Sequence, residues 1–175
     1  MKIEPKDCKW EDTIDLGDGR SIKLEYPYDT DHEEPWNDGD CRGIVSEWTR
    51  REKRPGERIL ITDGYSRRYF NIEATMKEAR TTWGFTDREQ AAKAVEWEFQ
   101  HLRRWCQNLW SYIGVCVTLL DAEGKEISSE SVWGFESEGD DYAEEAASFA
   151  NDLIEAHDKE LAESAYWAER EVMTV

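Results

Sequence analysis

The distribution of charge constrains this chain more than any other feature of its sequence. Residues 121–175 carry 17 acidic side chains and three basic ones, a local net charge of −14 in a chain whose total is −18. Residues 1–40 have a net charge of −8, and residues 41–120 have a net charge of +4. Blocks of opposite sign in one small chain indicate different faces with different partners. The acidic block is repelled by nucleic acid phosphates but can imitate them.

Length and composition favour a folded protein. The 175 residues fit one domain, so we expect a single α+β domain over residues 1–175. Nine Trp, seven Tyr and five Phe supply large apolar side chains for a core, which argues against disorder. No apolar run reaches the length of a signal sequence or a membrane span, so we expect no membrane partner and a cytoplasmic location.

The cysteines predict thiols rather than disulfides or a zinc site. Cys8, Cys41, Cys106 and Cys116 are far apart and form no C-x-x-C pair. In a reducing compartment such residues are free thiols, and two of the four lie in apolar stretches typical of a core. A zinc site that combined them with the three histidines would lack the usual ligand spacing.

The order of periodic segments predicts an α+β fold. Three pairs of short segments read as β-hairpins, at residues 10–16 with 21–26, 57–62 with 67–71, and 113–121 with 126–135. Residues 44–50 fit a short strand or a helical turn. We expect one short helix over residues 72–82 and two long ones over residues 86–112 and 141–172. The prediction is an antiparallel sheet built from three hairpins and packed against two long helices and one short helix.

Each long helix is expected to bury an apolar stripe. Thr86 and Glu89 have the spacing of a capping box that opens the first long helix, and Trp110 widens its apolar arc. The stripe of the last helix comprises Tyr142, Ala146, Phe149, Leu153, Leu161 and Ala165. Off that stripe lie acidic residues that we expect to bind a partner, namely Glu144, Glu145, Asp152, Glu155, Asp158 and Glu163. Carboxylates one helical turn apart stand about 5 to 6 Å from each other, comparable to the spacing of phosphates along a nucleic acid strand.

No catalytic motif competes with this acidic face. The sequence has no nucleophile elbow, no H-E-x-x-H zinc motif and no phosphate-binding loop, so we expect no enzyme, no catalytic residue and no cofactor. The best enzymatic alternative is a small metal-dependent enzyme that uses the acidic loop 29–40. That loop offers Asp29, Asp31, His32, Asp38 and Asp40 as ligands, but Glu34 occupies the position where an EF-hand loop needs glycine.

The basic block has two interpretations. Its charged and aromatic residues could hold phosphates, or they could pair with the protein's own carboxylates. The net charge of −18 opposes the approach of nucleic acid, so we expect internal pairing and no direct nucleic acid binding. The residues concerned are Arg50, Arg51, Lys53, Arg54, Arg58, Arg67, Arg68 and Tyr69.

Four short stretches carry a resemblance to a group of known proteins. They are residues 43–48 (GIVSEW), 54–57 (RPGE), 102–106 (LRRWC) and 131–137 (SVWGFES). The region from Asp31 to Ser137 that contains them resembles small acidic proteins of unassigned function from tailed bacteriophages and prophages. The resemblance implies an accessory protein that acts inside a bacterial cell, and it transfers no functional residue.

Together these features favour a non-enzymatic inhibitor. We expect the acidic last helix to imitate DNA or RNA and to bind a host nucleic-acid-binding protein of defence or repair, such as a restriction or CRISPR nuclease. A phage assembly or accessory protein is the further alternative, in which the acidic face is solvated and serves solubility.

Overall fold

The chain forms two compact units. The computed structural model describes residues 2–9, 12–37 and 43–172. Unit 1 combines Met1–Thr30 with Ser111–Val175, and unit 2 is Asp31–Trp110. The described elements are three helices and antiparallel sheets, which confirms the predicted α+β class. That the two units belong to a single domain stays a prediction, because a domain in this sense is a part of the chain that unfolds as one.

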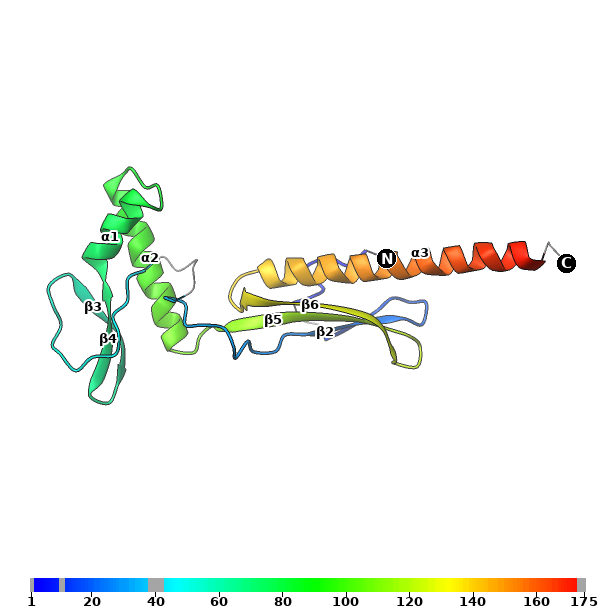
Figure 1. Cartoon of the computed structure of the whole chain (residues 1–175), viewed down its shortest axis with the longest axis horizontal. Helices are drawn as coiled ribbons and strands as arrows, with labels where there is room; N and C mark the ends of the chain where they lie inside the picture. The colour runs from blue at the N-terminus through cyan, green and yellow to red at the C-terminus, as the bar shows by residue number, and fades with distance from the viewer. Residues whose placement is uncertain (1, 10–11, 38–42, 173–175) are drawn as a thin grey trace. The chain divides into compact units, whose positions relative to one another are not determined.

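Unit 1 contains a four-stranded antiparallel sheet (Figure 1). Its strands are β1 (Thr13–Asp15), β2 (Ser21–Glu25), β5 (Tyr112–Leu120) and β6 (Glu126–Glu136), in the order β1-β2-β5-β6. The other two strands form a separate sheet in unit 2, so the six strands do not make the one sheet that the sequence predicted. The predicted first strand began at residue 10, but residues 10 and 11 lie outside the described residues.

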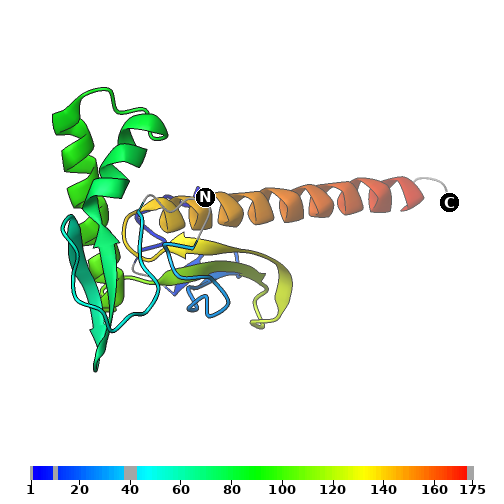
Figure 2. The same cartoon turned by 60° about the vertical axis from the view of Figure 1, so that its left-hand side comes forward.

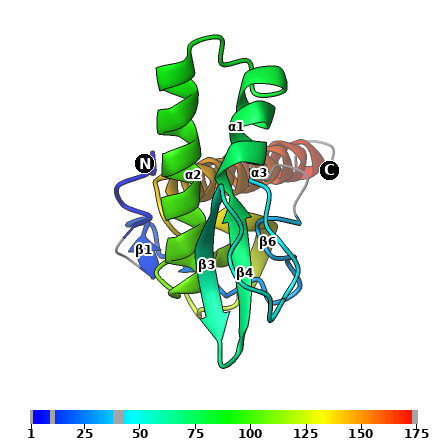
Figure 3. The ribbon, with the colours of Figure 1, turned by 90° about the vertical axis from the view of Figure 1, so that its left-hand side faces the viewer.

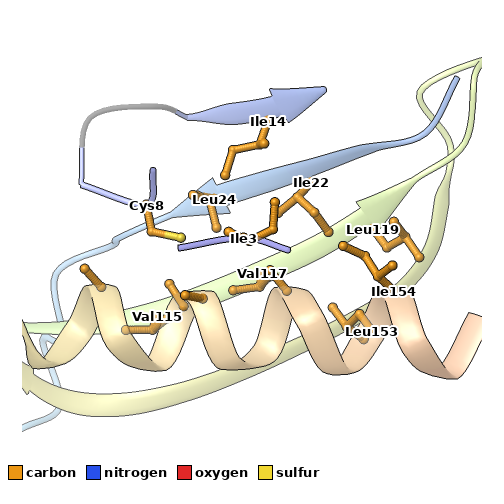
Figure 4. Close-up of a cluster of buried hydrophobic side chains, with 14 residues drawn as sticks. Ile3, Cys8, Ile14, Ile22, Leu24, Val115, Val117, Leu119, Leu153 and Ile154 are labelled. Atoms are coloured by element: carbon orange, nitrogen blue, oxygen red, sulfur yellow. The ribbon is translucent and has the colours of Figure 1, made fainter. Parts of the chain in front are cut away.

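The register of these strands places their apolar residues on one face. Ile22 pairs with Leu119, and Leu24 pairs with Val117. Because side chains alternate between the faces of a strand, these pairs put every second residue on the same side. Figure 4 shows the resulting cluster between the strands and the last helix. The large aliphatic side chains at its centre are Ile3, Ile22, Leu24, Val115, Val117 and Leu119.

Helix α3 (Asp141–Val172) covers this face of the sheet. Its buried positions in the first three turns are all alanine, at residues 143, 146, 147 and 150. Alanine lets a helix approach a sheet closely, so the bulky side chains of the strands fill the space between them. Leu153 and Ile154 are the last helix residues of the buried cluster.

The rest of α3 extends beyond the sheet (Figures 1 and 2). Every residue from 158 to 170 is exposed. The prediction that Leu161 and Ala165 continue the buried stripe is therefore wrong. The reason is that the buried contacts of α3 end at Leu153 and Ile154, and the helix then continues past the sheet (Figure 1). None of the described helices has the length and apolar character of a membrane span.

Asn151 ties the N-terminal segment to α3. Its Oδ1 accepts a hydrogen bond from Ile3 N at 2.9 Å, and its Nδ2 donates to Ile3 O at 2.9 Å.

We expect Asn151→Ala to lower the free energy of unfolding of unit 1 by about 1–3 kcal/mol, because two buried backbone groups of Ile3 lose their partner. Denaturant unfolding measures the loss, and faster amide exchange at Ile3 locates it. Unchanged exchange at Ile3 would show that other contacts hold this segment.

Unit 2 combines a hairpin with two helices (Figure 3). The hairpin strands are β3 (Glu57–Asp63) and β4 (Ser66–Asn71), and the helices are α1 (Ile72–Thr81) and α2 (Arg88–Cys106). Residues 44–50 run beside β4 and make isolated bridges at Val45 and Thr49, rather than a regular strand or helix. The core lies between the hairpin and the helices and comprises Leu60, Phe70, Ala79, Ala91, Val95, Phe99 and Leu102.

The ends of α2 differ from the prediction. The N-cap is Asp87, whose side chain accepts a hydrogen bond from Gln90 N, so the predicted capping box of Thr86 and Glu89 is wrong. Asp is a stronger N-cap than Thr, which explains the shift by one residue. The helix ends at Cys106 instead of reaching residue 112, because Asn108 adopts the left-handed conformation (φ 57°) that terminates helices. Trp110 is buried beyond the helix, where its Nε1 donates to His101 O.

Candidate partner-binding surface

Helix α3 presents the six predicted partner-binding carboxylates away from the core. Glu145 is half-buried, and the other five are exposed. At 100° per residue five of them span an arc of about 100° away from the buried alanines, and Asp158 lies at the border with the alanine side. From Glu144 to Glu163 the helix axis extends about 28 Å. We call this surface the acidic face, and it comprises Glu144, Glu145, Asp152, Glu155, Asp158 and Glu163.

Asp158 differs from the other five because it has a structural partner. Its Oδ1 lies 2.8 Å from Nη1 of Arg20, which also contacts Nδ1 of His157 at 2.9 Å. The same guanidinium hydrogen-bonds Asp18 and lowers the pKa of that carboxyl to about 2. Arg20 therefore anchors α3 to the loop between β1 and β2, and it offsets the charge of Asp158.

The remaining five carboxylates form no ion pair with any residue in the described part of the chain. Solvated helix faces usually mix Lys with Glu in i,i+4 pairs, whereas α3 has only Lys159 and Arg170 as bases. The first four of the five lie on the part of α3 that packs on the sheet. Their positions are therefore fixed by the core, and a partner need not order the helix backbone there.

Unit 1 carries nearly all of the net charge of the chain. It contains 25 acidic and 8 basic residues, a net charge of −17, whereas unit 2 contains 15 acidic and 14 basic residues. The field of unit 1 thus attracts a basic partner surface and repels nucleic acid.

The exposed end of α3 adds large apolar side chains that sequence analysis assigned to the core or did not consider. The exposed fractions are 54% for Leu161, 52% for Tyr166 and 62% for Trp167. The two aromatic rings pack edge to face at 5.4 Å, and Arg170 lies over both. The difference in length between α3 and β6, about 12 Å, could have revealed the last two turns of this end but not the exposure of Leu161. We call residues 159–170, which follow the anchored Asp158, the free end of α3.

The predicted internal pairing of the basic block holds for three of its seven basic residues, all in unit 2. Arg51 forms a bidentate pair with Glu57, whose pKa the guanidinium lowers. Arg58 pairs with Glu96. Arg68 is buried, with Glu34 at 3.4 Å and the ring of Trp36 beneath it. These three arginines serve the fold of unit 2. The other basic residues of the block, Arg50, Lys53, Arg54 and Arg67, make no ion pair with a described residue.

The proposed metal ligands of loop 29–40 are only partly described. Asp38 and Asp40 lie outside the described residues, and Asp29 and Asp31 belong to different units. His32 Nδ1 lies 3.0 Å from Glu33 O. Among the described residues no group of three His, Cys, Asp or Glu side chains could hold a metal ion.

The described cysteines are free thiols. Cys8 is fully buried, and Cys106 and Cys116 are half-buried. Burial raises the pKa of both Cys8 and Cys106 to about 11. These thiols are therefore protonated at neutral pH and unsuited to nucleophilic chemistry. Cys41 lies outside the described residues.

The chain matches no protein-family model, no curated protein and no solved structure.

Proposed function

We propose that this chain is a non-enzymatic inhibitor that inserts helix α3 into the nucleic-acid channel of a host protein. The observation that carries the proposal is the acidic face, with five unpaired carboxylates on a helix whose first half is held by the core of unit 1. Channels that bind DNA or RNA are lined with Lys and Arg. Carboxylates spaced along one helix can accept the charge-assisted hydrogen bonds that these residues otherwise donate to phosphates.

The free end of α3 supports a partner interface that is more than electrostatic. Tyr166 and Trp167 expose apolar area beside the carboxylates, and Leu161 exposes more on the side of the helix that carries the buried alanines. Trp and Tyr are enriched among the residues that dominate binding energy at protein interfaces. In the complex, the acidic face replaces phosphates, and the free end of α3 contacts apolar side chains at one end of the channel.

The resemblance to phage proteins suggests the kind of target. A phage accessory protein acts in the cytoplasm of a bacterial host, where nucleases attack phage DNA. A restriction enzyme, a CRISPR effector or a recombination nuclease each has a basic nucleic-acid channel of the required kind.

Affinity capture tests this function. The immobilised chain is incubated with bacterial lysate at low salt, and bound proteins are eluted by a salt gradient or by duplex DNA. We expect a nucleic-acid-binding protein that both treatments release, because salt screens the carboxylates and DNA competes for the same channel. If every captured protein resists both salt and DNA, the proposed function is wrong.

A further inference from the structure

A groove in unit 2 runs along the outer edge of strand β3. Its cavity volume is about 850 Å³. One wall is formed by five consecutive residues of β3, Arg58 to Thr62, and the other includes Phe99, Arg103 and Cys106 of α2. Successive side chains of a strand point to opposite faces. A groove lined by five consecutive residues therefore reaches the edge of the strand, and Arg67 and Tyr69 of β4 extend its lining across the hairpin.

This edge has no strand partner among the described residues. The sheet of unit 2 has two strands, and the isolated bridges of residues 45 and 49 are made to β4 on its far side. An edge strand leaves backbone N–H and C=O groups unpaired on its outer side, which is a template for another strand. Ile59, beside the groove, is 45% exposed. The bulge between Ile59 and Ile61 twists the edge and limits an added strand to a short one.

The groove is basic although the chain is acidic. Four bases and one acid, Glu52, line it. Arg58 is held in place, since it pairs with Glu96 at 2.5 Å and stacks on Phe99 at 3.8 Å. The other three bases, Lys53, Arg67 and Arg103, form no ion pair with a described residue. The charge available in the groove therefore selects an anionic ligand.

We propose that the edge of β3 binds an extended acidic peptide segment of a partner protein, which adds to the hairpin as a third strand. Main-chain hydrogen bonds to β3 would provide affinity, and the bases would select acidic side chains. This site is independent of α3 and does not rest on the function proposed above.

Other occupants fit these observations less well. Nucleic acid cannot complete a β-ladder, because it has no backbone N–H and C=O groups to pair with those of β3. A second copy that paired β3 with β3 would place the bases of one groove against the bases of the other, which is unfavourable.

Fluorescence anisotropy with a labelled peptide of alternating Glu and Val tests the proposal. Lys53 and Arg103 are exposed, so the double variant Lys53→Glu with Arg103→Glu should fold normally. We expect this variant to bind the peptide about tenfold more weakly than the unchanged protein. The matched control, Arg88→Glu with Lys93→Glu, makes the same change in net charge on exposed α2 residues outside the groove and should keep the affinity.

The backbone contribution is tested separately. Peptide binding should slow amide exchange within β3. Alternate N–H groups of a strand point to opposite edges, so of two peptides N-methylated on every Glu or on every Val, at least one should not bind. Equal binding of both N-methylated peptides and the unmodified peptide would overturn the proposal, as would equal weakening by the control variant. The proposal is also wrong if oligo-dT binds the groove and the peptide does not, or if peptide-free protein forms a dimer that protects β3.

Discussion

Replacing Phe70 by alanine is expected to lower the free energy of unfolding of unit 2 by about 3–5 kcal/mol. The ring is fully buried and packs edge to face against Phe99, with centroids 5.5 Å apart. Gly43 packs so closely on it that a Cβ at residue 43 would lie 2.6 Å from the ring. Alanine would leave a cavity that the surrounding helix and hairpin cannot close. Denaturant unfolding measures the loss of stability, and calorimetry provides an independent measurement.

Tyr65→Ala is the control for this prediction, because Tyr65 is the exposed tip of the same hairpin and its loss should change stability by less than about 0.5 kcal/mol. The Phe70 variant also tests the predicted single domain. If the two units unfold together, the variant shifts one common transition. A transition for unit 1 that stays in place while that of unit 2 shifts would show two domains.

Much of the fold followed from local patterns in the sequence. Helix α3 has the predicted bounds, and no end of β5 or β6 differs from its predicted position by more than one residue. These elements were predictable because strand alternation and helical spacing are properties of neighbouring residues. The end of α2 was missed because one residue, Asn108, takes a conformation that apolar spacing does not encode. The separation into two sheets depends on which hairpins pair, and such long-range pairing leaves no local signal.

The candidate surfaces were also predictable only where they depend on local spacing in the sequence. Helical spacing was enough to place Glu144, Asp152 and Glu155 on one side of α3. It could not show that Asp158 pairs with Arg20, which comes from a loop far away in the sequence. It also could not find the groove at β3, because the free edge follows from the order of strands in the sheet.

Neutralising the acidic face is expected to weaken partner binding at least about a thousandfold, while the fold stays intact. The variant replaces five carboxylates by Gln and keeps Asp158, because Asp158 anchors α3 through Arg20. Charge-assisted hydrogen bonds contribute about 1.5–3 kcal/mol each, so three lost contacts account for the effect. Gln has nearly the helix propensity of Glu, so α3 should remain helical. The changed residues are Glu144, Glu145, Asp152, Glu155 and Glu163.

A matched control separates the acidic face from net charge alone. It replaces five glutamates outside α3 by Gln, so the total charge rises by the same amount. All five are exposed, and none forms an ion pair with a described residue. The control residues are Glu4, Glu47, Glu73, Glu123 and Glu130.

The most direct test of α3 as a nucleic acid mimic is the dissociation constant of the captured partner for these three proteins, measured over a range of salt concentrations. We expect the unchanged protein and the control to bind with similar affinity, which falls steeply as salt rises, and the acidic-face variant to bind at least about a thousandfold more weakly at low salt. Equal affinity of the acidic-face variant and the control at low salt would contradict the account, because the carboxylates of α3 would then be only a solvated surface.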